Sequence, residues 1–242
     1  MTSAHSATSN AQALKLTHKI GKIFRRESHV RGVRRLRRHL HPIRLEPLLK
    51  RIDPARLEQI RARHASCPRQ VAKYADVPYW LKVNIERVQD LGLPLGPPRR
   101  ILDIGCGGGF FLFVAKHLGH DVVGLDCPGY ALYDDLVDLF GLERRLWETK
   151  AFEPLPDLAS RFDLITAFST GFNRRADKSL WGPNEWEFFL DDLRGHLNPK
   201  GQVFLALNPA ETGRTYYTDE LRDFFLKRGA EIERERVWFK KL

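Results

Sequence analysis

The sequence predicts an α/β fold in which a doubly wound, mostly parallel sheet follows a basic helical extension at the N-terminus. After residue 99, short apolar runs alternate with amphipathic stretches of about a dozen residues, which is the pattern of consecutive βαβ units. Charge divides the chain at the same place, because residues 1–99 hold 21 Lys and Arg against 7 Asp and Glu, whereas residues 100–242 hold 19 against 23. The net charge of +10 therefore comes from the first part.

The N-terminal extension is predicted to be helical and only partly ordered. Residues 1–13 are small and polar, which favours disorder. Between residues 14 and 40, apolar residues recur every three or four positions among basic ones, as in an amphipathic helix. Such a helix suits a polyanionic partner, either RNA or an anionic membrane surface, although a solvated charged face explains the same pattern. Phe24 is the only aromatic residue before Tyr74, which disfavours RNA, and no DNA readout motif is present.

Two further helices are predicted before residue 99. One covers residues 53–65 and begins with Asp53 as N-cap and Pro54 at the first helical position. The other covers residues 77–92 and precedes the pair Pro97–Pro98, which marks the start of the main domain. The predicted organisation is a basic, partly disordered helical extension, a helical lid segment and a main α/β domain, at residues 1–67, 68–98 and 99–242.

The main domain is predicted to alternate strands with helices. The strands are residues 100–105, 121–126, 144–152, 162–169, 201–208 and 230–241, the third being the weakest pattern. The helices are residues 110–119, 130–141, 183–197 and 218–229. Right-handed crossovers would place these helices on both faces of one sheet.

Composition excludes several classes of protein. With 242 residues and 43% hydrophobic residues, the chain is long enough to bury a core, and no window reaches the roughly 18 apolar residues of a membrane span. The first residues lack the apolar segment of a secretory signal, so the sequence favours a cytoplasmic protein, with peripheral membrane association left open by the basic extension. Cys67, Cys106 and Cys127 show no CxxC spacing and no nearby His pair, so neither disulfides nor a metal site is expected.

Four glycines occupy the turn between the first strand and the first helix of the main domain. They are Gly105, Gly107, Gly108 and Gly109, in the stretch "DIGCGGG". In a doubly wound sheet this turn lies at the carboxyl edge, where ligands bind. A turn without side chains lets the backbone approach a ligand closely and adopt positive φ angles. The turn therefore predicts an adenosine-type ligand.

The residues beside the turn disfavour ligands that contain phosphate. A dinucleotide site needs GxGxxG, and Phe110 stands where the third glycine belongs. Asp103, two residues before Gly105, would repel a pyrophosphate at the helix N-terminus, and no Gly-Lys-Ser/Thr loop occurs here. Asp126 ends the second strand, 19 residues after Gly107, where an acid can accept hydrogen bonds from ribose hydroxyls. S-adenosylmethionine fits, because it carries an ammonium group and a sulfonium and no phosphate.

Residues 99–208 resemble the core of the class I S-adenosylmethionine-dependent methyltransferases, whose sheet is Rossmann-like. The matching segments are "ILDIGCGGG", "VVGLD", "FEPLPD", "RFDLITAFS" and "LNPKGQVFLALN", in the order and spacing of the family. The resemblance implies S-adenosylmethionine as cofactor and methyl transfer as activity. It implies that the methionine and sugar portion contacts Asp103, Gly105, Cys106 and Gly107, and that the ribose hydroxyls contact Asp126. It also implies that adenine contacts Phe152 and that the sulfonium region contacts Phe168 and Ser169.

Two features depart from the family pattern. Many relatives have an acid before the residue that contacts adenine, and this chain has Ala151 there, which cannot bond the adenine amino group. The sheet of the family commonly ends in an antiparallel hairpin, whereas a single long strand, residues 230–241, is predicted here. The seventh strand is therefore expected to be merged or missing.

The acceptor of the methyl group and the catalytic residues stay unassigned by the sequence. The histidines of the main domain, His117, His120 and His196, are placed at the edge opposite the ligand, so none is a good base. The loops on the ligand side offer Ser169, Thr170, Asn173, Arg174, Asn208 and Glu211. Because the stretch "FSTGFN" lacks the Asx-Pro-Pro-aromatic signature of amide and nucleobase nitrogen methylation, the sequence favours a small-molecule or glycan-like acceptor.

The segment before the first strand is interpreted as a lid. The resemblance implies that the helix carrying Tyr79, Trp80 and Lys82 folds over the cofactor and excludes water. The alternative function is a weakly catalytic or non-catalytic module of the same fold that binds RNA or an anionic membrane surface through its basic arm.

Overall fold

The computed structural model describes residues 32–33, 35–36, 38–172, 180–209 and 216–242. The chain divides into two compact units, residues 1–43 and 44–242. Most of the predicted basic helix therefore lies outside the described residues. Those that are described between residues 32 and 40 are helical, with Val33, Leu36 and Leu40 exposed.

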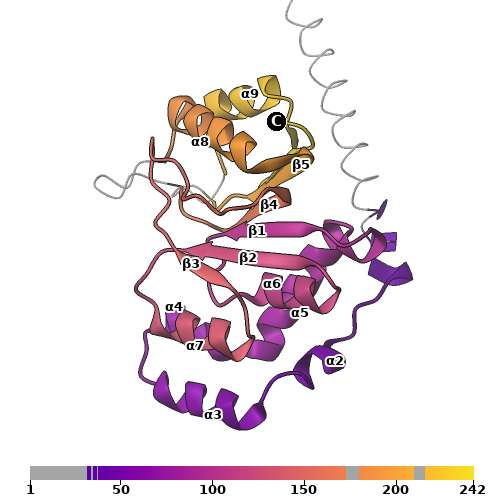
Figure 1. Ribbon diagram of the computed structural model, residues 1–242, viewed down its shortest axis with the longest axis vertical. Coiled ribbons are helices and arrows are strands. Elements are labelled where there is room, and N and C mark those ends of the chain that lie inside the picture. The colour runs from indigo at the N-terminus through magenta and orange to yellow at the C-terminus, as the bar shows by residue number, and fades with distance from the viewer. Residues whose placement is uncertain (1–31, 34, 37, 173–179, 210–215) are drawn as a thin grey trace, which may run out of the picture. The chain divides into compact units, whose positions relative to one another are not determined.

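The second unit is built on a seven-stranded sheet in the order β3-β2-β1-β4-β5-β7-β6 (Figure 1). The strands are β1 (Arg100–Ile104), β2 (Asp121–Asp126), β3 (Arg144–Leu146), β4 (Phe162–Phe168), β5 (Leu197–Ala206), β6 (Glu231–Glu233) and β7 (Arg236–Phe239). The pairs among β1 to β5 are parallel, and β7 pairs antiparallel with both β5 and β6. The prediction of a doubly wound, mostly parallel sheet is confirmed.

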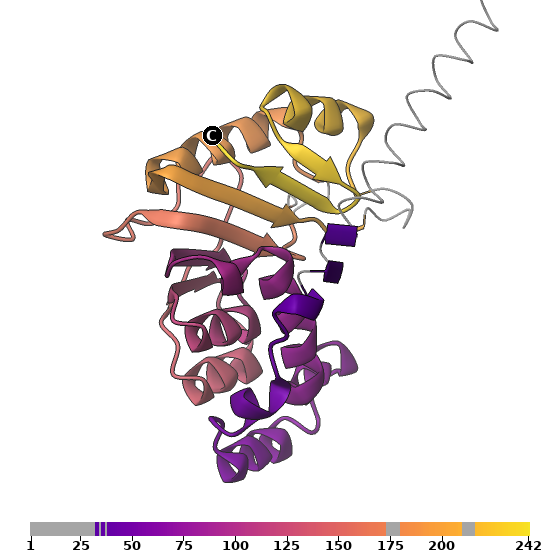
Figure 2. The same ribbon diagram turned by 90° about the vertical axis from the view of Figure 1, so that its right-hand side faces the viewer.

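Helices cover both faces of this sheet (Figures 1 and 2). The α-helices are α2 (Leu45–Leu49), α3 (Pro54–Arg63), α4 (Arg69–Ala72), α5 (Val77–Asp90), α6 (Phe110–His117), α7 (Ala131–Leu139), α8 (Pro183–His196) and α9 (Asp219–Lys227), with short 3-10 helices η1 (Lys73–Ala75) and η2 (Leu93–Leu95). On the side of α8 and α9, a buried cluster joins Trp186, Phe189 and Phe225 to the strands. Helix α5 packs on α6, and α3 packs on α7.

Local signals in the sequence account for where these helices begin. The Asp53 carboxylate accepts hydrogen bonds from the backbone N–H groups of Ala55 and Arg56, at 2.9 and 3.2 Å, as an N-cap does. Helix α5 is capped by Asp76, and α9 by Thr218, whose hydroxyl accepts from the Leu221 N–H at 3.1 Å. The predicted starts of these helices are therefore close to those observed.

The C-terminal strand prediction is wrong. Residues 230–241 form a hairpin of β6 and β7 instead of one long strand, and the seventh strand is present. The turn between them contains Arg234 at a φ of +52°, and the Tyr217 hydroxyl donates to the Arg234 carbonyl at 2.8 Å. Since the turn contains no Gly, Asn or Pro, the sequence carries none of the usual turn signals.

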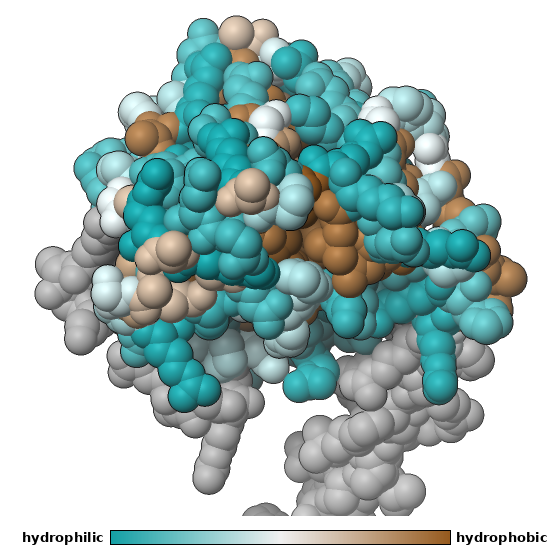
Figure 3. Space-filling view, turned by 90° about the horizontal axis from the view of Figure 1, so that it is seen from below, coloured by the Kyte–Doolittle hydropathy of each residue, from teal (hydrophilic) through white to brown (hydrophobic). Residues whose placement is uncertain are grey.

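The segment before β1 belongs to the same compact unit as the sheet. The division after Ile43 puts α2 and α3 with the sheet, although the sequence placed residues 44–67 in the extension. In the part of the chain that the structure describes, no helix is both long and apolar enough to cross a membrane. The surface seen from the side of α3 is mostly hydrophilic, with an apolar area near its centre (Figure 3).

Candidate functional site

A cavity of about 500 Å³ lies where the parallel strands end. It is lined by residues at or just after the ends of β1, β2, β3 and β4: Gly105, Asp126, Cys127, Trp147, Glu148, Thr149, Lys150, Ala151, Thr170, Gly171 and Phe172. The carboxyl ends of four neighbouring strands thus meet at one opening, as expected for a ligand site in a doubly wound sheet.

Of the glycine turn, Gly105 lines the cavity and Gly107 does not, and the conformation of the turn requires its glycines. Gly105, Gly107 and Gly109 have φ angles of +71°, +55° and +76°, in the left-handed region that L-residues avoid. A Cβ on Gly105 would also lie 2.5 Å from Thr170 Oγ1. The Thr170 hydroxyl in turn donates to the Ile104 carbonyl at 3.0 Å. The missing side chain therefore lets the loop after β4 close against the end of β1.

Asp126 forms the adjoining wall, and backbone amides orient its carboxylate. One oxygen accepts a hydrogen bond from the Gly107 N–H at 2.8 Å and the other from the Cys127 N–H at 2.9 Å. Burial raises the pKa of Asp126, while these two hydrogen bonds act in the opposite direction. Each oxygen keeps a second acceptor site, so the carboxylate can also accept from ligand hydroxyls.

Asp103 is not part of the cavity wall. It pairs in register with Thr166 of β4, whose hydroxyl donates to the Asp103 carboxylate at 2.7 Å. Only 3% of Asp103 is exposed. Burial raises its pKa to about 7, although the Thr166 hydroxyl and the charge of Arg87 favour the ionised form.

Arg87 joins Asp103 and Phe168 into a second group of side chains, and sequence reasoning missed it. Its guanidinium lies 4.6 Å from the centre of the Phe168 ring and donates to the Asn84 side chain at 3.1 Å. Burial lowers its pKa, although the negative charge of Asp103 acts against this. The sequence signal that could have identified Arg87 is its position next to the buried residue Val88 on the amphipathic helix α5.

The other predicted residues lie in different surroundings. Cys106 is buried, and its sulfur would lie 2.6 Å from a Cβ on Gly124, so its thiol packs in the core. The Phe168 ring packs against Phe111, with ring centres 4.8 Å apart. Ser169 has a φ of +55° and accepts a hydrogen bond from the Asn208 side chain at its carbonyl, at 2.7 Å.

The loop after β3 approaches the cavity through Trp147 to Ala151 and not through Phe152. The Phe152 side chain is 53% exposed and makes an edge contact with Phe188, with ring centres 6.0 Å apart. The structure therefore leaves Phe152 outside the described cavity wall. Trp147, which no sequence signal marked, lies within it.

The histidines lie away from the cavity, as the sequence predicted. His120 Nδ1 accepts a hydrogen bond from the Arg99 N–H at 3.1 Å, just before β1 begins. His196 ends α8 and lies 3.8 Å from Asp192. No histidine is among the described residues that line the cavity. Asn173, Arg174 and Glu211 lie outside the described residues.

We expect Asp103 to make stability fall as pH rises. Its pKa of about 7 in the folded protein exceeds the ordinary value of 3.8, so the folded state holds this proton more tightly than the unfolded state. The contribution of protonated Asp103 to the free energy of unfolding is fully present below about pH 4 and is lost as pH rises towards 7. The loss between pH 5 and 8 amounts to about 3 kcal/mol.

Urea unfolding of the wild type and of Asp103→Asn at several pH values measures this effect. The amide keeps an acceptor for Thr166 and does not titrate, so the variant should gain about 3 kcal/mol relative to the wild type from pH 5 to pH 8. A difference that does not change with pH would contradict the raised pKa.

Comparison with known proteins gives two curated relatives. The ubiquinone biosynthesis O-methyltransferase of Bordetella avium (strain 197N) is 27% identical over 167 residues, which are 64% of this chain and 67% of that protein. The tRNA U34 carboxymethyltransferase of Campylobacter hominis is 28% identical over 110 residues, or 44% of this chain and 35% of that protein. No protein-family model matches the chain.

Two methyltransferases are among the solved structures that align with this chain. A TehB-like S-adenosylmethionine-dependent methyltransferase from Corynebacterium glutamicum aligns with a TM-score of 0.49 and 20% identity over 78% of this chain and 100% of its own. An amino pentose methyltransferase from Micromonospora echinaspora aligns with a TM-score of 0.41 and 24% identity over 52% of this chain and 50% of its own.

Proposed function

We propose that this chain, a class I S-adenosylmethionine-dependent methyltransferase, transfers the methyl group to a small-molecule acceptor. The observation that carries the proposal is the cavity across the carboxyl ends of β1 to β4, which joins a turn without side chains to the Asp126 carboxylate. The volume of about 500 Å³ is in the range of small-molecule sites. The sequence likeness to an O-methyltransferase over 64% of the chain supports an acceptor of this class.

The residues of the cavity fit the parts of S-adenosylmethionine. We assign the Asp126 carboxylate to the ribose hydroxyls, because its oxygens are already oriented by two backbone amides. Gly105 and Gly107 give the sugar and methionine portions access to the backbone. Asp103 and Arg87, which lie together outside the wall, are suited to the ammonium and carboxylate groups of the methionine end.

The cofactor supplies an activated methyl group, so this chain has to align the acceptor and exclude water. The loop after β4, with Thr170, Gly171 and Phe172 in the wall, lies against the start of the glycine turn. Phe172 is 6% exposed and packs against Trp181 and Trp186, with ring centres 5.1 and 4.7 Å away. This packing gives the acceptor side of the cavity a fixed apolar wall.

The lid assignment for α5 stays a proposal, supported by an aromatic chain. Trp80 stacks on Tyr74 with ring centres 4.5 Å apart, and Tyr74 contacts Tyr133 at 5.2 Å. The Tyr133 ring is 3.8 Å from the place a Cβ on Gly107 would take. Tyr79 and Lys82 are exposed, and no residue of α5 is among the described residues of the cavity wall. We therefore assign the lid role to Trp80, which is linked to the glycine turn through Tyr74 and Tyr133.

Adenine is expected to lie against Trp147. Trp147→Ala should weaken S-adenosylmethionine binding about 10-fold, because stacking of a base on an aromatic ring contributes roughly 1–3 kcal/mol. Phe152→Ala is the matched control, since that ring is exposed outside the wall, and its effect should stay below about 2-fold. Calorimetric titration of both variants measures this, and the reverse ranking would favour the Phe152 contact predicted from the sequence.

Methyl transfer is tested with a panel of small acceptors that carry hydroxyl or amino groups. The expected result is formation of S-adenosylhomocysteine with at least one of them, dependent on the acceptor and on the folded chain. Turnover on RNA with none on small acceptors would overturn the proposed acceptor class. The alternative of a non-catalytic, polyanion-binding module rests on the basic segment of residues 15–51, of which residues 15–31, 34 and 37 lie outside the described part.

A further inference from the structure

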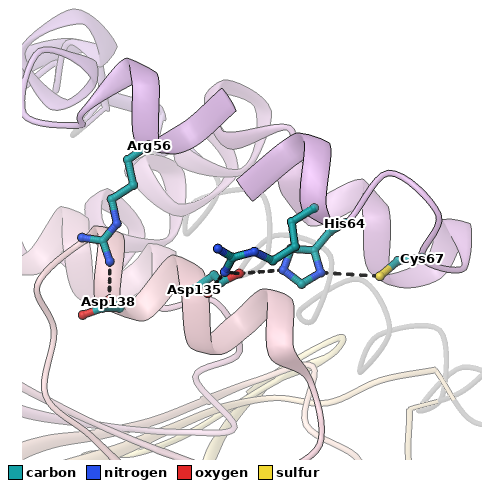
Figure 4. Close-up of polar contacts among 6 residues, drawn as sticks. Arg56, His64, Cys67, Asp135 and Asp138 are labelled. Atoms are coloured by element: carbon teal, nitrogen blue, oxygen red, sulfur yellow. Dashed lines mark hydrogen bonds and ion pairs between the residues drawn. The ribbon is translucent and has the colours of Figure 1, made fainter. Parts of the chain in front are cut away.

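A second cluster of reactive side chains lies away from the cavity, between α3 and α7 (Figure 4). Cys67 Sγ is 3.7 Å from His64 Nδ1. On the opposite side of the same ring, His64 Nε2 is 2.7 Å from a carboxylate oxygen of Asp135. A thiol, an imidazole and a carboxylate therefore form a continuous chain, in the order that activates a nucleophile.

The carboxylate determines which nitrogen of His64 carries the proton. Burial would raise the pKa of Asp135, but the hydrogen bonds from His64 and Arg63 outweigh this and lower it, so Asp135 is ionised at neutral pH. An ionised carboxylate only accepts hydrogen bonds, so neutral His64 donates from Nε2 and presents an unprotonated Nδ1 towards Cys67. Nδ1 is thereby set to accept a proton from the thiol.

A backbone hydrogen bond and a contact between α3 and α7 hold this arrangement in place. Residues 64 to 67 form a turn in which the Cys67 N–H donates to the His64 carbonyl at 3.1 Å. Arg63 donates to both oxygens of Asp135, at 3.0 and 2.9 Å, and fixes the carboxylate. His64 is 6% exposed, so water does not separate the ring from its partners, while Cys67 is partly exposed and accessible to a small reagent.

The other two cysteines provide a contrast within the same chain. Cys106 is buried, and burial raises its pKa well above the ordinary value for a thiol. Cys127 is partly exposed at the cavity. The Cys106 thiol donates to the Gly107 carbonyl at 3.9 Å, and the Cys127 thiol hydrogen-bonds to the Asp126 side chain. The partner of Cys67 is instead the oriented imidazole of His64.

We propose that Cys67 is a nucleophilic thiol that hydroperoxides oxidise to a sulfenic acid, with His64 as the base. His64 Nδ1 accepts the thiol proton as sulfur attacks one peroxide oxygen, so that the S–O bond forms and the O–O bond breaks. The leaving alkoxide, or hydroxide where the oxidant is hydrogen peroxide, takes the proton from His64 and becomes the alcohol or water. Sulfur loses two electrons, the peroxide gains them, and His64 returns to its neutral form.

A purely structural role is the competing explanation. Arg63 and His64 bond to Asp135 and Arg56 bonds to Asp138, so these residues also fasten α3 to α7. A fastening role makes no demand on the reactivity of Cys67. The rate at which Cys67 is oxidised therefore separates the two roles, whereas stability alone does not.

The test treats the full chain with hydrogen peroxide, traps sulfenic acid with dimedone and follows each cysteine by mass spectrometry. In the wild type, Cys67 should be labelled at least about 10-fold faster than Cys127. His64→Gln should remove that advantage, because the amide can still donate to Asp135 but offers no base at the Nδ1 position. His117→Gln is the matched control and should leave the rate unchanged, since His117 ends α6 and its Nδ1 has no hydrogen-bond partner in the described structure.

A second measurement keeps the proposal testable if a variant fails to fold. In urea, the wild-type Cys67 should lose its advantage over Cys127, because the cluster exists only in the folded chain. The proposal is overturned if folded Cys67 reacts no faster than Cys127, or if His64→Gln leaves its rate unchanged in a folded protein.

Discussion

Asp126→Ala is expected to weaken S-adenosylmethionine binding about 100-fold. The carboxylate is assigned two hydrogen bonds from ribose hydroxyls, and hydrogen bonds to a charged group contribute about 1.5–3 kcal/mol each. Its position is fixed by the backbone amides of Gly107 and Cys127, which lose their acceptor in the variant. Isothermal titration calorimetry measures the dissociation constant directly.

The control for this prediction separates binding from folding. Asp121→Ala changes an acid at the opposite end of β2, where it forms an exposed ion pair with Arg100. It should leave the affinity unchanged, because exposed ion pairs contribute little and the residue is remote from the cavity. Unchanged binding in a folded Asp126→Ala protein would refute the assigned cofactor site.

Gly105→Ala is expected to destabilise the protein by about 3 kcal/mol and to abolish cofactor binding. An L-residue at a φ of +71° costs about 1–2 kcal/mol, and the new Cβ would lie 2.5 Å from Thr170 Oγ1. To relieve the overlap, the Thr170 side chain or the loop after β4 has to move, and Thr170 lines the cavity. Urea unfolding gives the stability, and calorimetry gives the binding.

Gly119→Ala is the matched control for the backbone part of this effect. Gly119 has a φ of +88°, and no atom lies within 4 Å of its added Cβ, so only the conformational cost of about 1 kcal/mol remains. If Gly105→Ala and Gly119→Ala destabilise the protein equally, the contact with Thr170 is not tight. Adding Thr170→Ala to Gly105→Ala should recover part of the loss, since it removes the nearest atom.

The order of the strands and helices could be predicted because each is encoded locally. Apolar runs, the caps Asp53 and Thr218 and the glycine turn all act within a few residues of the structure they specify. The hairpin of β6 and β7 could not be predicted, since its turn at Arg234 uses a positive φ without a glycine. Pairing with β5 and the bond from Tyr217 stabilise that turn from elsewhere in the chain.

The part of the candidate site that could be predicted is the part whose position the strands and the glycine turn determine. Gly105 and Asp126 reach the cavity because strand ends determine where they stand. Arg87 joins Asp103 only after α5 packs against the sheet, and Trp147 enters the wall only because β3 ends at Leu146. The contact of Cys67 with His64 is local, whereas Asp135 is 71 residues from His64 in sequence. Contacts between residues that are distant in the sequence depend on how the helices and strands pack, which the pattern of one sequence does not specify.

The outermost strands of the described sheet, β3 and β6, are three residues long and rich in charge. Arg144 and Arg145 stand at one margin and Glu231 and Glu233 at the other. Such short edge strands expose few unpaired backbone N–H and C=O groups, and charged side chains flank those groups. A strand of another molecule therefore has little backbone to pair with. The folded protein should consequently resist aggregation through these margins at high concentration.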